Sequence, residues 1–269
     1  CAEPPGQQHA AWVESIEGMG VDLRYSRRDA GSAAWAASIR VAPITGAERS
    51  WPGITVDAAG RVHVVWLEQS GSGPTLRHAS KDPAGRAFGP GRRLTDSGAR
   101  PMPHSPRVAA DRVGNVHVVW SDARRGDPDI LHRRRDGSGG WSEIVRVNSD
   151  VRGDQVEPAL TDTPSGELVA VWRDTRDGSS HIQAARLPQF GDVWWPDARL
   201  SAELLMHHMP AVASDGNGVV TAVWLAEDES GQALRWARLA SGDPERPYWE
   251  LDRESYRSTR GHVLDLAVS

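Results

Sequence analysis

The sequence has little cysteine, little lysine and no long apolar run. These scarcities limit the disulfides and membrane spans that the chain could form. A single cysteine among 269 residues excludes an internal disulfide. Lys81 is the only lysine among 31 basic residues, which we interpret as a general preference for arginine. The apolar runs are too short to span a bilayer. A net charge of -5 gives no reason to expect a basic groove for nucleic acid.

The one cysteine is residue 1, and a polar stretch with no apolar period follows it through Gln8. This arrangement resembles a mature bacterial lipoprotein, in which the cysteine sulfur carries a diacylglyceryl group. The resemblance implies an acylated Cys1, a tether over residues 1–8 and a lipid-anchored location in the bacterial cell envelope, periplasmic or on the outer surface. An acylated Cys1 leaves no thiol for catalysis. The alternative is that the sequence was simply trimmed to begin there.

Five tryptophans recur at intervals of 52 to 54 residues, and three further columns keep the same register. The tryptophans are Trp12, Trp66, Trp120, Trp172 and Trp224. Six positions before the last four stand Gly60, Gly114, Gly166 and Gly218; nine before stand Asp57, Asp111, Thr163 and Asp215; fourteen before stand Pro52, Pro106, Pro158 and Pro210. Four columns in one register indicate a chain built from five repeats.

Each repeat contains four short strand-like segments, and no long segment has a helical period. In the second repeat they are Ile54–Val56, the segment ending at Trp66, Thr75–His78 and Arg92–Thr95. Repeated four-stranded units are typical of propeller blades. We therefore predict an all-β, five-bladed β-propeller over residues 9–269, with four antiparallel strands per blade. The first repeat lacks an inner strand, so residues 262–269 are expected to complete blade one and close the ring.

Three repeats carry related turns between their third and fourth strands. They are Ser26-Arg27-Arg28-Asp29-Ala30-Gly31 with Trp35, Ser80-Lys81-Asp82 with Gly85 and Phe88, and Asp136 with Trp141. These turns resemble the Asp-box of the sialidase-like propellers, which reads Ser-x-Asp-x-Gly-x-x-Trp. The resemblance covers nearly the whole chain and implies the fold. Fold alone does not confer an activity.

Sialidases of that superfamily use three arginines, a Tyr–Glu nucleophile pair and an acid–base Asp. The chain has three tyrosines: Tyr25 on a third strand, Tyr248 near a fourth, and Tyr256, which we place in the last connection and so within reach of the propeller mouth. It also lacks an Arg-Ile-Pro motif before the first blade. The sialidase set is not recognisable, and the sequence leans against an enzyme.

Carboxylates follow the repeated tryptophans where the axial face of the propeller is expected. They are Glu14, Glu68, Asp122, Asp174 and Glu227; Glu157 precedes Pro158, and Arg124 and Arg176 lie four residues after their tryptophans. A ring of carboxylates around a channel could hold a glycan or a cation, because glycosidases place carboxylates on opposite sides of the scissile bond. The alternative is that Trp-x-Asp-x-Arg forms a salt-bridged hairpin loop, repeated because the blade is repeated.

Histidines form a second candidate set, two positions before the proline column. His104 and His208 stand there, and the closing strand can be aligned to add His262. Three imidazoles around one mouth would suit zinc or copper. However, they come from separate blades with no local ligand spacing, so we expect hydrogen-bonded or solvated histidines and predict neither a metal nor a cofactor.

The sequence also lacks a glycine-rich phosphate loop and a Gly-x-Ser-x-Gly elbow. We therefore predict a membrane-anchored, non-catalytic docking or accessory subunit of a larger envelope complex, respiratory or photosynthetic. Trp51, Met206 and Met209, at blade entrances, are the candidate interface with a partner protein. The alternative is a glycan-binding protein or a sialidase-like or five-bladed glycoside hydrolase acting on an extracellular saccharide, with a patch around Glu157, Arg124 and Arg176.

Overall fold

The computed structural model describes residues 6–18, 20–71, 73–95, 106–124, 126–201, 205–229, 231–240 and 248–258. These residues form strands and turns but no helix, so none of them forms a helix that could cross a membrane. Cys1, His104, His262 and the predicted closing strand lie outside the described residues.

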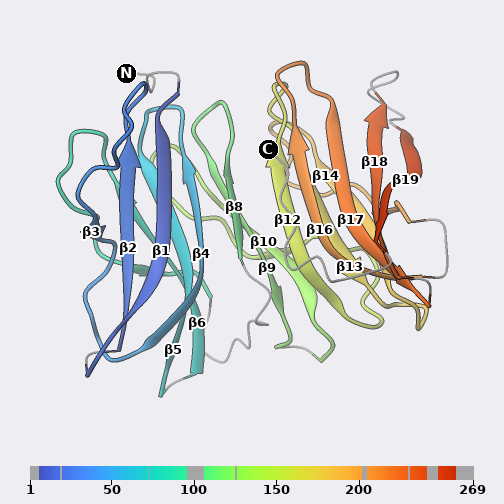
Figure 1. The fold of residues 1–269 in the computed structure, drawn as a ribbon, viewed down its shortest axis with the longest axis horizontal. Helices are drawn as coiled ribbons and strands as arrows, with labels where there is room; N and C mark the ends of the chain where they lie inside the picture. The colour runs from blue at the N-terminus through green and yellow to red at the C-terminus, as the bar shows by residue number, and fades with distance from the viewer. Residues whose placement is uncertain are drawn as a thin grey trace. The chain divides into compact units, whose positions relative to one another are not determined.

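The strands form five sheets, and within each sheet neighbouring strands follow one another in the chain (Figure 1). The first sheet has three strands, β1 (Gln8–Ile16), β2 (Gly20–Arg28) and β3 (Ile39–Arg40). The second contains β4 (Glu48–Val56), β5 (Val62–Ser70), β6 (Gly73–Lys81) and β7 (Arg92–Arg93). The third contains β8 (Arg107–Ala110), β9 (Val116–Asp122), β10 (Asp129–Arg135) and β11 (Val145–Arg146). The fourth contains β12 (Gln155–Asp162), β13 (Leu168–Asp174), β14 (His181–Leu187) and β15 (Ala198–Arg199). The fifth contains β16 (Met206–Ser214), β17 (Val220–Asp228), β18 (Gly231–Ala240) and β19 (Tyr248–Ser258).

Five repeated antiparallel sheets confirm the prediction of an all-β, propeller-like chain, whereas closure of a ring stays a prediction. The chain divides into two compact units, and the division runs through the third sheet. Unit 1 contains residues 1–118, 122–124 and 133–143; unit 2 contains residues 119–121, 125–132 and 144–269. One strand differs from expectation, because Tyr256 lies in β19 and not in a connection.

The repeated tryptophans form the core of the sheets. Trp66 in unit 1 and Trp172 and Trp224 in unit 2 are completely buried, and Trp120 is nearly so. They pack among strand valines and leucines, including Val64 beside Trp66. Their assignment to the core is therefore confirmed, and truncating one to alanine should cost about 3–5 kcal/mol. Trp12 is only partly buried, in a sheet that has no described strand inside β1.

The Asp and Gly columns form the turn between the first and second strands of four sheets. Asp111 illustrates the geometry: its Oδ1 accepts the backbone N–H of Val113 at 3.1 Å and of Asn115 at 2.8 Å. Gly114 adopts a φ of 87°, in the left-handed region that only glycine enters without strain. In the fourth sheet the Thr163 hydroxyl replaces the carboxylate and accepts the Glu167 N–H at 3.1 Å. These columns therefore specify a turn.

Aromatic side chains from the turns of one repeat pack on the next-to-last strand of the sheet before it. In unit 1, Phe88 meets Tyr25 edge-on, with ring centroids 5.3 Å apart. In the same unit, Trp141 meets His78 at 5.1 Å. In unit 2, the Trp194 indole donates to Nδ1 of His132 at 3.3 Å. This recurrent contact joins consecutive sheets within each unit.

A chain of three polar groups is buried in the second sheet. Oδ2 of Asp57 lies 3.0 Å from Nε2 of His63, whose Nδ1 lies 3.0 Å from Nε2 of His78. Burial, together with the positive charges of His63 and Arg135, holds the pKa of His78 well below its ordinary value. His78 is therefore neutral in the folded protein at neutral pH.

Candidate functional site

The first strands of three sheets share an unusual backbone feature near their start. β4, β12 and β16 each contain a bulge, and each bulge holds a non-glycine residue in the left-handed region directly before a proline. These residues are Trp51 (φ 55°), Glu157 (φ 57°) and Met209 (φ 53°). The left-handed conformation costs an L-residue roughly 1–2 kcal/mol, and a following proline further restricts the residue before it. Strain maintained at three equivalent positions marks them as candidates for function.

The side chains at these positions differ although the backbone is the same. Trp51 is 43% exposed, Glu157 is largely covered, and Met209 is intermediate. The bulge therefore does not require a particular side chain. A position that keeps its backbone but varies its side chain is free to serve binding or chemistry.

Glu157, in unit 2, is the most firmly oriented of the three. One carboxylate oxygen accepts Nε–H of Arg173, on β13, at 2.9 Å. The other accepts the backbone N–H of Met209, on β16, at 2.6 Å. The side chain remains 15% exposed. A carboxylate has about four acceptor positions, so two donors orient Glu157 and leave capacity for a ligand.

The residue beside this contact carries an unsatisfied imidazole nitrogen. His208 precedes Met209 on β16, and its Nε2 is buried with no hydrogen-bond partner among the described residues. Its neighbour His207 is engaged, because Trp224 Nε1 donates to its Nδ1 at 3.1 Å. His208 therefore directly precedes the Glu157 contact in the chain, with one ring nitrogen buried and unsatisfied.

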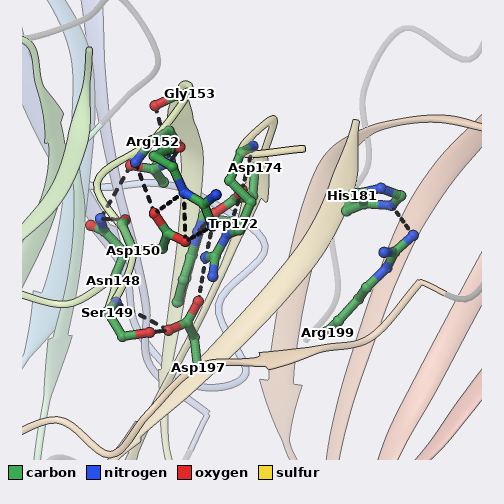
Figure 2. A network of polar contacts seen from close by, with 12 residues as sticks. Asn148, Ser149, Asp150, Arg152, Gly153, Trp172, Asp174, His181, Asp197 and Arg199 are labelled. Carbon is green, nitrogen blue, oxygen red and sulfur yellow. Dashed lines mark hydrogen bonds and ion pairs between the residues drawn. The ribbon is translucent and has the colours of Figure 1, made fainter. Parts of the chain in front are cut away.

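The repeated Asp–Arg pairs are arranged differently. Asp174 is completely buried, and Oδ1 accepts both the backbone N–H and Nε–H of Arg176 at 2.9 Å. Oδ2 accepts from Arg176 Nη2 at 2.6 Å and from Trp172 Nε1 at 3.2 Å. Arg176 also contacts Asp197, which Ser149 contacts in turn, as part of the network in Figure 2. These carboxylate hydrogen bonds raise the pKa of Arg176. The network closes the turn after β13 and leaves Asp174 no access to a ligand.

The other predicted carboxylates also lie beside arginine or amide side chains of their own sheets. Asp122 is buried and accepts from Arg124 Nη2 at 2.6 Å, in unit 1. Glu68 is buried between Arg77 at 2.5 Å and Arg49 at 3.3 Å. Glu14 is exposed with Arg24 at 3.5 Å, and Glu227 is partly buried with Gln232 at 3.4 Å.

Of the remaining candidates, Met206 is 61% exposed at the start of β16. No group of three His, Cys, Asp or Glu side chains within the described ranges is placed to hold a metal ion. The sequence did not reveal Arg173 as the partner of Glu157. The sequence showed the proline column but gave no sign of the bulges. A residue before proline normally avoids the helical regions, so a left-handed residue there was not expected.

Comparison with protein-family models and with curated proteins gives no match. Solved structures do resemble the fold. The chain aligns over 95% of its length with 84% of an intramolecular trans-sialidase from Ruminococcus gnavus, with a TM-score of 0.63 and 8% identity. It aligns over 87% of its length with 75% of an α-L-arabinanase from Penicillium chrysogenum (0.61, 14% identity), and over 92% with 69% of a PL25 ulvan lyase (0.63, 10% identity).

These similarities establish a sialidase-like β-propeller fold. They also overturn the prediction of a non-catalytic docking or accessory subunit, because the structural neighbours are sialidases, an arabinanase and a lyase that act on saccharides.

Proposed function

We propose that this protein binds and cleaves a saccharide, with Glu157 as its reacting carboxylate. The observation that carries the proposal is the orientation of Glu157: a strained pre-proline bulge presents it, and Arg173 and the Met209 N–H fix its two oxygens. Most glycosidases cleave the glycosidic bond with carboxylates held against the sugar, one of which acts as base or nucleophile. The saccharide-acting neighbours of the same fold support this choice.

Trp51, in unit 1, is a separate candidate for binding a saccharide, argued independently of Glu157 in unit 2. Trp51 presents a 43% exposed indole from the equivalent bulge of β4. An indole offers a large, rigid apolar face at small entropic cost, which suits packing against a sugar ring. We therefore propose Trp51 as a sugar-contacting residue of unit 1.

The proposal includes closure of the five sheets into a ring, with a strand from residues 262–269 completing the first sheet. The described part of that sheet has three strands, one fewer than each of the other four sheets. The Asp-box identity of the turns, a lipid anchor at Cys1 and an envelope location stay predictions.

Replacing Trp51 by alanine tests whether its indole packs against a sugar ring. A panel of arabinan, sialylated oligosaccharides and uronic-acid polysaccharides is first used to find a bound saccharide by titration calorimetry. Trp51→Ala should then weaken binding about tenfold, equivalent to roughly 1.4 kcal/mol.

Trp35→Ala is the matched control, because Trp35 is 45% exposed but lies outside the bulges. Equal loss of affinity in both variants would show that Trp51 has no special role. Saccharide binding that Trp51→Ala leaves unchanged would show that Trp51 does not contact the saccharide.

A further inference from the structure

A cavity of about 350 Å³ lies inside unit 1, away in sequence from Glu157. Its walls come from the end of β2, from residues 36–39 and from the turn that follows β6. Three basic residues line it: Arg27, Lys81 and Arg86. Tyr25, Ile39 and Pro83 supply apolar wall. The volume falls in the range of small-ligand sites.

Lys81 is the unusual member of this lining. The side chain is the only lysine in the sequence, and the residue is 7% exposed. Its Nζ makes a hydrogen bond to the backbone oxygen of Asp82 at 3.2 Å, and within the described part of the chain no carboxylate forms an ion pair with it. An ammonium group has three donors, so burial with one acceptor and no counter-ion is costly.

The neighbouring charges do not neutralise it. The carboxylate of Asp82 points to Arg61, at 2.7 Å, and Arg27 is paired only loosely with Asp29, at 3.5 Å. Burial, reinforced by Arg27, lowers the pKa of Lys81, while Asp82 acts in the opposite direction. The cavity therefore has a surplus of positive charge, which an anion entering it would offset.

We propose that this cavity binds a small oxyanion, a carboxylate or sulfate ester carried by a ring of monosaccharide size. Lys81 and the guanidinium groups of Arg27 and Arg86 hold the oxyanion, and Tyr25, Ile39 and Pro83 pack against the ring. Anion binding here does not depend on catalysis at Glu157. Failure of either proposal would therefore leave the other unaffected.

The experiment uses titration calorimetry of the full chain with glucuronate, inorganic sulfate and glucose. Glucuronate should bind saturably, sulfate should bind more weakly because it lacks the ring, and glucose should not bind. Lys81→Met should reduce glucuronate affinity at least tenfold, whereas Lys81→Arg should retain most of it. Sulfate binding as tightly as glucuronate would overturn the ring contact, and no binding of either anion would overturn the site.

Thermal unfolding provides the second measurement. Replacing an unpaired buried charge by an apolar chain of similar length is neutral or stabilising. Lys81→Met without ligand should therefore unfold at the same temperature as the wild type or higher, and should lose the stabilisation that glucuronate gives the wild type. A lowered unfolding temperature without ligand would assign Lys81 a structural role and contradict the proposal.

Discussion

At the scale of single residues, ionisable groups inside this protein differ in whether they are paired with an opposite charge. Asp174 has its arginine, and Glu157 has Arg173 and a backbone N–H. His78 is instead kept neutral inside the second sheet, because burial lowers its pKa. Each arrangement has a different consequence when the pH changes or a partner is removed.

His78 should make the protein less stable in mild acid. Its folded pKa lies well below 6.5, the ordinary value, so below pH 6.5 the unfolded chain binds more protons than the folded one. The free energy of unfolding should therefore fall as the pH drops from about 6.5 towards the folded pKa, by up to about 1.4 kcal/mol per pH unit. Urea unfolding between pH 7.5 and 5 measures this slope.

His78→Gln, which keeps a polar group but cannot gain the proton, should show a shallower slope over the same pH range. His63 also has a pKa lowered by burial and remains in the variant, so some slope should persist. Identical slopes in the two proteins would exclude His78 as a source of acid sensitivity.

At the scale of strands and turns, the repeat columns specify local geometry. The Asp and Gly columns predicted a turn with a left-handed glycine, and all four glycines adopt one, with φ between 74° and 87°. The bulges at Trp51, Glu157 and Met209 could not be predicted in this way. Non-glycine residues before proline normally avoid the left-handed region, so the sequence carries no local signal for these bulges.

Gly114→Ala should destabilise the protein by roughly 1–2 kcal/mol, because an alanine at φ 87° is strained. No atom lies within 4 Å of the added Cβ, so the cost comes from the backbone alone. Urea unfolding should show a lower midpoint with an unchanged slope.

Gly137→Ala is the matched control, since Gly137 has equally open space but no left-handed φ. It should be neutral or slightly stabilising. Equal destabilisation by both substitutions would show that the left-handed turn is not what the glycine column preserves.

At the scale of the whole molecule, the sequence repeat predicted the architecture, because every repeat must bury the same face. The tryptophan register predicted five sheets, and four of the five tryptophans are buried as core. The same periodicity says less about the candidate site. It drew attention to Asp122 and Asp174, which repeat because they close turns onto Arg124 and Arg176. Glu157 breaks the repeat, and its partners became visible only in three dimensions.

The central claim is that Glu157 reacts with a saccharide, and loss of turnover in Glu157→Gln tests it most directly. The variant should reduce turnover by about 10²–10⁴-fold, because the amide cannot act as base or nucleophile. Glu167→Gln is the control: Glu167 is similarly buried, at 13% exposure, and pairs with Arg186 in the same sheet.

The measurement is mass-spectrometric detection of shortened oligosaccharides after incubation with the wild type and the two variants. We predict cleavage of at least one saccharide by the wild type and by Glu167→Gln, and almost none by Glu157→Gln. Equal cleavage by Glu157→Gln, or no cleavage of any saccharide by the wild type, would contradict the account.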